Sequence, residues 1–247
     1  MGSLDGQVAL VTGAGQGSGR GVALAFATEG AWVALVGRTE SKLLAVESEV
    51  RDRGSAAMSI RCDVGENAQI DAAVEAVLSK FGRIDVLVNA AHHDVRRGTL
   101  LEMSDDDVEL LWTTGPRATP RSLRRCHPHL RGGGSIVNFG SSAQMNPPNF
   151  GSYAAMKDAI RAISRAAAVE WGPDQIRVNV IAPYTDSPNM VADLAPRGGP
   201  SSYSIPLGRV GDSENDIGRV CVFLASDDAS YLTGQFFVLD GGFAYHR

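Results

Sequence analysis

Short apolar runs alternate with longer amphipathic segments along most of the chain. Runs at 8–12, 32–36, 56–62 and 86–89 are typical of buried strands, and apolar residues recur at helical spacing in the segments between them, 21–30, 40–53 and 66–81. Strands that alternate with helices of this length form βαβ units around a parallel sheet. The pattern resumes with expected strands at 135–139, 177–182 and 235–239 and a helix at 152–171. The sequence therefore predicts an α/β fold with seven strands.

Two segments depart from this regular alternation. Residues 105–130 have a helical pattern that contains Pro116 and Pro120, and proline removes a backbone donor and clashes with the preceding turn, so we expect a kink or a split. Residues 183–207 are rich in proline, glycine and serine, which is typical of a functional loop when it is this long. No repeat or change in composition marks a second domain, so we expect residues 1–247 to form one domain.

Composition and charge argue against several other classes of protein. A formal net charge of −5 gives no reason to expect nucleic acid or an anionic membrane as a partner. No apolar run approaches the roughly 20 residues that a membrane span needs, and no secretory signal is recognisable. Cys62, Cys126 and Cys221 are odd in number and far apart, unlike a disulfide framework. The simplest expectation is a cytoplasmic protein.

A glycine-rich turn joins the first expected strand to the first expected helix. Residues 12–19 read T-G-A-G-Q-G-S-G, which fits T-G-x-x-x-G-x-G and not G-x-G-x-x-G. Glycines let the backbone approach a pyrophosphate, and the N-terminus of the helix offers unpaired N–H groups and a positive dipole. A flexible turn without a ligand is the alternative, but the flanking strand and helix favour a dinucleotide site.

The end of the second expected strand indicates which dinucleotide binds. An acidic residue there would accept hydrogen bonds from the ribose 2′-hydroxyl and favour NAD. This chain has Gly37 and Arg38 instead, so no carboxylate repels a phosphate and the guanidinium can contact one in bidentate fashion. We therefore expect NADP(H). The alternative is an ordinary surface arginine in a protein that prefers NAD(H).

Tyr153 and Lys157 lie four residues apart in an expected helix, so their side chains share one face. A free tyrosine has a pKa of about 10, and a nearby ammonium favours the tyrosinate and lowers that pKa. Such a pair can exchange a proton with a carbonyl or alcohol oxygen near neutral pH. Ser141 follows the fifth expected strand, where its hydroxyl could polarise the same oxygen, and Ser142 is the alternative.

These residues, in this order, resemble the short-chain dehydrogenase/reductase family from about Gln7 to Gly242. The other matching elements are Asp63-Val64, Asn89-Ala90, Arg177-Val178-Asn179 with Pro183, and Gly234-Gln235 followed by Asp240-Gly241-Gly242. The resemblance implies a single doubly wound, Rossmann-like domain with a seven-stranded parallel sheet flanked by helices. It implies an oxidoreductase that moves a hydride between NADP(H) and a carbonyl or secondary alcohol, and a homotetramer.

The resemblance also implies roles for individual residues. Tyr153 would transfer the proton, Lys157 would hold the nicotinamide ribose and lower the tyrosine pKa, and Ser141 would position the substrate oxygen. By analogy, a lid within residues 183–207 would include Met190, Val191 and Leu194. The residues expected to bind the cofactor are Gly13, Gln16, Gly17, Ser18, Gly19, Arg38, Asp63, Val64, Asn89, Ala90, Ala91, Tyr153, Lys157 and Pro183.

The sequence departs from the family pattern at four positions. Ser18 replaces the usual Ile, Ala91 replaces a glycine near the cofactor, and Tyr184 replaces a glycine after Pro183. Trp112 aligns with the helix asparagine that usually completes the catalytic set, and Thr113 or Thr114 would have to substitute for it. These departures keep open a second hypothesis, a cofactor-binding protein of this fold with little redox activity.

Two histidine pairs are candidates for other roles. Neither His92-His93 nor His127-Pro128-His129 has a carboxylate or cysteine at ligand spacing, so we expect no metal site. His92 and His93 follow the fourth expected strand, at the edge where parallel sheets bind their ligands, so we consider them as substrate contacts.

Overall fold

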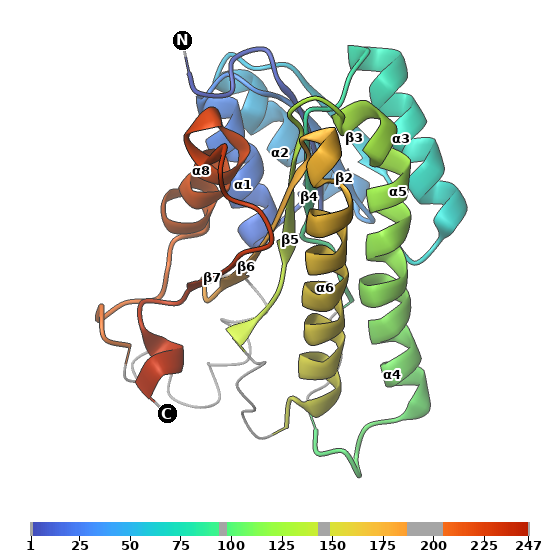
Figure 1. Ribbon diagram of the computed structural model, residues 1–247, viewed down its shortest axis with the longest axis vertical. Helices are drawn as coiled ribbons and strands as arrows, with labels where there is room; N and C mark the ends of the chain where they lie inside the picture. The colour runs from blue at the N-terminus through green and yellow to red at the C-terminus, as the bar shows by residue number, and fades with distance from the viewer. Residues whose placement is uncertain (1, 94–97, 143–148, 187–204, 247) are drawn as a thin grey trace.

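One parallel sheet of seven strands forms the centre of the protein in a computed structural model, which describes residues 2–93, 98–142, 149–186 and 205–246. The strand order is β3-β2-β1-β4-β5-β6-β7. The strands are β1 (Val8–Thr12), β2 (Trp32–Gly37), β3 (Ala57–Arg61), β4 (Val86–Asn89), β5 (Ser135–Phe139), β6 (Arg177–Pro183) and β7 (Phe236–Leu239) (Figure 1). The α/β fold and the doubly wound sheet expected from the sequence are confirmed.

The sheet reverses its winding direction at β1. This strand pairs with β2 on one side and with β4 on the other, and the register places Thr12 directly beside Asn89. The glycine-rich turn after β1 and the segment after β4 therefore leave the sheet as neighbours. In open α/β sheets the crevice at such a reversal, outside the carboxyl ends of the strands, is where ligands bind.

Helices cover both faces of the sheet (Figure 1). On one face α1 (Gly17–Thr28), α2 (Glu40–Asp52) and α8 (Arg219–Ala225) bury a core that includes Phe26, Leu35 and Leu224. On the other face α3 (Asn67–Phe81), α5 (Ala118–Leu130) and α6 (Gly151–Glu170) bury a core that includes Leu87, Leu123 and Ile136. Strands covered on both sides are mostly apolar, which explains the long apolar runs in the sequence.

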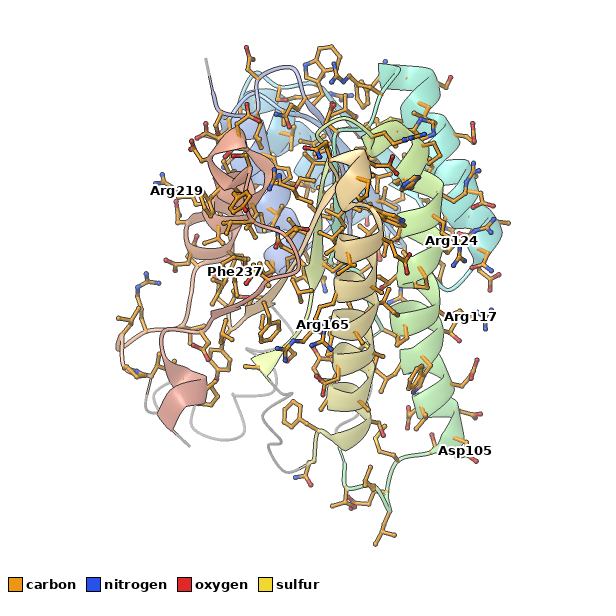
Figure 2. All side chains as sticks on the ribbon, viewed as in Figure 1. Asp105, Arg117, Arg124, Arg165, Arg219 and Phe237 are labelled. Carbon is orange, nitrogen blue, oxygen red and sulfur yellow. The ribbon has the colours of Figure 1, made fainter. Side chains whose placement is uncertain are left out.

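The segment 105–130, in which Pro116 and Pro120 predicted a kink or a split, is helical from end to end. It begins as α4 (Asp105–Trp112), continues as the π-helical η1 (Thr113–Arg117) and ends as α5. Pro116 lies inside η1, where a wider hydrogen-bonding pattern accommodates the missing backbone donor, so the expected interruption is a change of helix type and not a split. Asp105, Arg117 and Arg124 line the exposed side of this long helix (Figure 2).

Two other features differ from the sequence prediction. Helix α1 begins at Gly17, four residues before the predicted start at 21, because the last glycines of the turn are already helical although they carry no apolar pattern. Helix α8 was not predicted, since it has only seven residues.

The expected lid residues Met190, Val191 and Leu194 lie outside the described residues. Within the described part of the chain, no helix has the length and apolar character to cross a bilayer.

Helix α1 packs unusually closely on η6 (Ser213–Gly218). A Cβ at Gly21 would lie 2.1 Å from the Ser213 carbonyl oxygen, a contact that no folded backbone tolerates. We expect Gly21→Ala to lower the free energy of unfolding by roughly 1–3 kcal/mol, because the two helices must separate. Urea denaturation measures this. Gly172→Ala is the control, since nothing lies within 4 Å of a Cβ there; equal losses in both variants would contradict the packing argument.

Candidate active site

The glycine-rich turn has no room for side chains at two positions. A Cβ on Gly13 would lie 2.9 Å from the Ala91 nitrogen, and one on Gly19 would lie 2.3 Å from the Gly13 oxygen. Gly13 and Gly17 also have positive φ angles of 71° and 54°, which favour glycine. The backbone therefore curls tightly into the start of α1, whose first N–H groups lack helical partners. This arrangement suits a pyrophosphate.

Thr12 holds the segment after β4 against this turn. Its hydroxyl accepts hydrogen bonds from the backbone N–H groups of Ala90 (3.1 Å) and Ala91 (3.2 Å) and donates to the Val88 carbonyl (3.3 Å). The side chain is buried, so water does not compete for these bonds. Thr12 was not predicted as a site residue, although it opens the motif in the sequence; its role is to position the two alanines.

The other predicted residues of the turn are fixed by side-chain contacts. Gln16 precedes α1 and its side-chain oxygen accepts a hydrogen bond from the Lys42 ammonium. Ser18 lies in the first turn of α1, where its hydroxyl is 3.0 Å from that of Thr185. Thr185 follows Pro183, the last residue of β6, so this bond joins the turn to the far half of the sheet.

A mostly apolar pocket opens at the carboxyl ends of the first four strands. Its walls include Thr12, Val36, Val64, Asn89 and Ala91, together with residues of α3 and α5. Three of these, Val64, Asn89 and Ala91, are residues that the sequence predicted beside the cofactor. This cavity places apolar walls and a few polar groups next to the glycine-rich turn, a combination found in small-molecule sites.

At the rim of the site, three strand ends bring ionisable side chains together. Arg38 follows β2, and its Nη1 lies 3.1 Å from Nδ1 of His93, which comes after β4. The other ring nitrogen of His93 is 3.9 Å from a carboxylate oxygen of Asp63, after β3. Burial and then Arg38 lower the pKa of His93, while Asp63 opposes both. We refer to Arg38, Asp63 and His93 as the rim cluster.

Tyr153 and Lys157 are one turn apart on α6, as the sequence predicted. The Lys157 ammonium lies 5.6 Å from the centre of the Tyr153 ring and donates a hydrogen bond to the Phe139 carbonyl (2.9 Å). Lys157 is only 2% exposed, and no salt bridge to it is found within the described residues. Burial lowers its pKa from 10.5 to about 7. A buried cation without a carboxylate costs stability, which is characteristic of functional sites.

His92 places a neutral imidazole beside Tyr153. The two ring centres are 5.8 Å apart. Burial, reinforced by the Lys157 ammonium, lowers the pKa of His92 to about 3, so the ring is uncharged at neutral pH. Nδ1 is buried and has no hydrogen-bond partner within the described part of the chain. Polar atoms left this way in a cleft are suited to contact a ligand.

Ser141 lies just beyond the end of β5 and is half-buried, as is Ser142. The preceding residue, Gly140, donates from its backbone to the Ile181 carbonyl at 2.7 Å. A Cβ on Gly140 would lie 2.8 Å from a methyl carbon of Val180, so β5 and β6 meet closely there. The end of β5 is thus held in place, and Lys157 bonds to the same stretch at Phe139.

A buried network of polar side chains connects β4, β5 and α6. The Asn89 amide donates to the Asn138 oxygen (2.8 Å) and accepts from the Ser122 hydroxyl (3.0 Å). Asn138 in turn donates to the hydroxyl of Ser164 on α6 (2.8 Å). The network fixes the helix that carries Tyr153 and Lys157. Of the residues in this network, only Asn89 was predicted from the sequence. Asn138 could have been recognised as a polar residue inside an otherwise apolar strand.

The residue that replaces the family's helix asparagine faces outward. Trp112 is 41% exposed, whereas Thr114 is 2% exposed. The Thr114 hydroxyl donates to the Leu110 carbonyl (2.9 Å) and accepts from the His93 backbone N–H (3.0 Å). Of the two threonines considered as substitutes, Thr114 is therefore the one directed into the site. Thr114 lies within the π-helical turn η1.

Contacts within the fold account for Tyr184, another departure from the family pattern, and for His127, a member of the second histidine pair. The Tyr184 ring is buried and stacks on Phe243, with ring centres 4.8 Å apart. His127 lies 2.9 Å from Asp174 through Nε2. Within the described residues, no group of three or more His, Cys, Asp or Glu side chains is placed to hold a metal ion.

The glycine-rich turn at the reversal of the sheet, with a buried Lys next to a Tyr on the helix after β5, defines the class of Rossmann-like dinucleotide-binding domains. A family model described as "Enoyl-(Acyl carrier protein) reductase" matches residues 13–244. The chain belongs to the short-chain dehydrogenase/reductase family.

Several characterised relatives are similar over nearly their whole length. A 12α-hydroxysteroid dehydrogenase from Clostridium sp. is 40% identical, over 98% of each chain. A D-threitol dehydrogenase from Mycolicibacterium smegmatis is 35% identical, over 97% of this chain and 94% of the relative. These similarities support an oxidoreductase that acts on alcohols or carbonyl compounds.

Solved structures agree with this assignment. Levodione reductase superposes with a TM-score of 0.93 at 29% identity, over 99% of this chain and 100% of the other. L-Sorbose reductase from Gluconobacter frateurii, solved with NADPH and L-sorbose, has a TM-score of 0.90 at 30% identity, over 100% and 99%. NAD⁺-bound xylitol dehydrogenase has a TM-score of 0.89 at 32% identity, over 97% and 99%.

Proposed function

We propose that this protein is an NADP(H)-dependent enzyme that interconverts a ketone and a secondary alcohol. The observation that carries the proposal is the buried ammonium of Lys157, which has the Tyr153 ring 5.6 Å away and no salt bridge within the described residues. A charge buried at this cost is best explained by a ligand that it contacts or a neighbour that it ionises.

We assign the chemistry to three side chains. The Tyr153 hydroxyl donates its proton to the substrate oxygen in reduction and takes it back in oxidation. The Lys157 ammonium stabilises the tyrosinate and can bind the nicotinamide ribose. The Ser141 hydroxyl, at the end of β5, holds the substrate oxygen towards Tyr153. General acid–base groups of this kind contribute about 10²- to 10⁴-fold to a rate.

The remaining predicted residues fit a dinucleotide along the carboxyl edge of the sheet. When bound, the nicotinamide supplies or accepts the hydride. We propose that the backbone of the glycine-rich turn binds the pyrophosphate, that Asp63 and Val64 contact the adenine, and that the segment after β4 and the end of β6 line the rest. The residues in these roles are Gly13, Gln16, Gly17, Ser18, Gly19, Asn89, Ala90, Ala91 and Pro183.

Arg38 is the residue we assign to the 2′-phosphate, and therefore to the preference for NADP(H). Because the structurally similar enzymes were solved with NADPH in one case and NAD⁺ in another, the preference rests on this side chain. We expect Arg38→Met to weaken NADPH binding by about tenfold or more, since one charge-assisted contact is lost, and to leave NADH binding within about twofold. Nicotinamide fluorescence titration measures both.

The control is Arg124→Met, which should change neither affinity, because Arg124 lies on the exposed side of α5 and is not among the residues that line the pocket (Figure 2). Wild-type protein that binds NADH more tightly than NADPH would overturn the NADP(H) assignment and leave the oxidoreductase assignment standing. Absence of binding to either nucleotide would mean that the replacements at Ala91 and Trp112 have disabled the site, and both the proposed reaction and the second hypothesis of a cofactor-binding protein would be withdrawn.

The relatives suggest where to look for the substrate. We propose a secondary alcohol or its ketone, and the 40% identity to a 12α-hydroxysteroid dehydrogenase makes a 12α-hydroxysteroid the first compound to test. D-Threitol is the second compound to test, because another relative is named D-threitol dehydrogenase. Absorbance of the reduced nicotinamide reports turnover in both directions.

Family resemblance also leads us to propose a homotetramer of one-domain subunits in the cytoplasm. Size-exclusion chromatography with light scattering tests the oligomeric state directly.

A further inference from the structure

We infer that His93 is a second ligand for the 2′-phosphate of NADP(H), acting as an imidazolium beside the Arg38 guanidinium. This inference rests on the proposed NADP(H) dependence and adds a residue from a different strand end. It makes discrimination between the two nucleotides dependent on pH, because an arginine is always charged and a histidine is not.

The geometry of the rim cluster carries the argument. Arg38 is exposed, yet its Nη1 contacts both ring nitrogens of His93, Nε2 and, at 3.1 Å, Nδ1. The backbone of His93 is held in place, because its N–H donates a hydrogen bond to the buried Thr114 hydroxyl at 3.0 Å. The two basic side chains therefore converge on one point at the rim, where a phosphate attached to the adenosine ribose would contact both.

The surrounding charges determine when His93 becomes protonated. The titratable groups that face it are Arg38, which disfavours the imidazolium, and Asp63, which favours it from 3.9 Å; the adjacent His92 is neutral. One Asp63 oxygen already accepts the Gly65 N–H at 2.9 Å, which holds the carboxylate in place. A dianionic phosphate beside the ring raises the pKa of His93, opposing the effect of Arg38, and so favours protonation of the imidazole. A ribose 2′-hydroxyl brings no charge and has no such effect.

Two nucleotide fragments isolate this end of the site from the redox chemistry. Adenosine 2′,5′-bisphosphate and adenosine 5′-monophosphate differ only in the 2′-phosphate, and calorimetric titration gives both affinities at about pH 6 and about pH 8.5. In wild-type protein we expect the preference for the bisphosphate to be larger at the lower pH. In His93→Gln we expect the bisphosphate to bind roughly tenfold more weakly at the lower pH and within about threefold of wild type at the higher pH.

Several controls keep the outcomes distinct. Gln retains the backbone bond to Thr114 and hydrogen-bonding capacity without charge, and thermal unfolding confirms that the variant is folded. The phosphate's own second ionisation, at a pKa of about 6, is common to wild type and variant and cancels in the comparison. His129→Gln, an exposed histidine of α5, is the matched substitution and should leave both affinities unchanged.

A His93→Gln protein that keeps its full preference for the bisphosphate at both pH values, while Arg38→Met loses it, would overturn the role of His93 and leave NADP(H) dependence intact. Equal weakening of both nucleotides would also overturn it, since His93 would then contact the adenosine. If wild-type protein shows no preference for the bisphosphate at either pH, the proposed NADP(H) dependence itself fails.

Discussion

Replacing Tyr153 by phenylalanine is expected to lower kcat by about 10²- to 10⁴-fold and to leave nucleotide affinity within about twofold. The substitution removes only the hydroxyl that we assign as the proton donor. The ring remains to pack beside His92 and Lys157, which lie 5.8 Å and 5.6 Å from it. Steady-state assays with a ketone or alcohol that the wild type turns over, combined with NADPH titration, separate the two effects.

The matched control is Tyr231→Phe, because Tyr231 is fully exposed and distant from the sheet edge that carries the site. Its kcat should equal that of the wild type. If Tyr153→Phe retains full turnover, another group supplies the proton. If the wild type binds nucleotide but turns over no carbonyl compound or alcohol, the cofactor-binding hypothesis becomes the better account.

The sheet was predictable because each strand is covered on both faces. Such strands are mostly apolar, as residues 8–12 and 86–89 are apart from their last residues, Thr12 and Asn89. The helices between the strands are then recognised by the period of their apolar residues. The prolines predicted the helix boundaries less well. Pro116 was expected to kink or split the helix at 105–130, but the structure keeps the helix and changes its hydrogen-bonding at η1. Local propensity does not reveal the change of helix type, because it accompanies a tertiary contact: Gly115 packs closely on Met156 of α6.

The candidate site was predictable only where residue type and spacing carry the chemistry. The glycines of residues 12–19 and the Tyr153–Lys157 pair meet that condition. The rim cluster does not, since Arg38, Asp63 and His93 come from three different strand ends and meet only through strand order. The same holds for Asn138 and Ser164, whose contact joins β5 to α6. Long-range pairings of this kind leave no periodic trace in a sequence.

Lys157→Met is expected to reduce kcat/KM by about 10²-fold or more. In the nucleotide-free protein, the same substitution should make the free energy of unfolding less dependent on pH. Burial lowers the pKa of Lys157 from 10.5 to about 7 in the folded state. Between these two values the unfolded chain carries a proton on Lys157 that the folded protein has released. The free energy of unfolding of the wild type therefore rises with pH across this window, and the cost of burying the charge is greatest below about pH 7.

The Met variant lacks this titration, so its free energy of unfolding relative to the wild type should fall by about 1–3 kcal/mol as the pH is raised from about 7 to about 9. Urea denaturation at each pH measures the difference, and Lys80→Met, an exposed lysine of α3, should show none. A relative stability that does not change with pH would mean that Lys157 keeps an ordinary pKa. In that case a counter-charge accompanies it in the folded protein, and the inference drawn from its unpaired burial would be withdrawn.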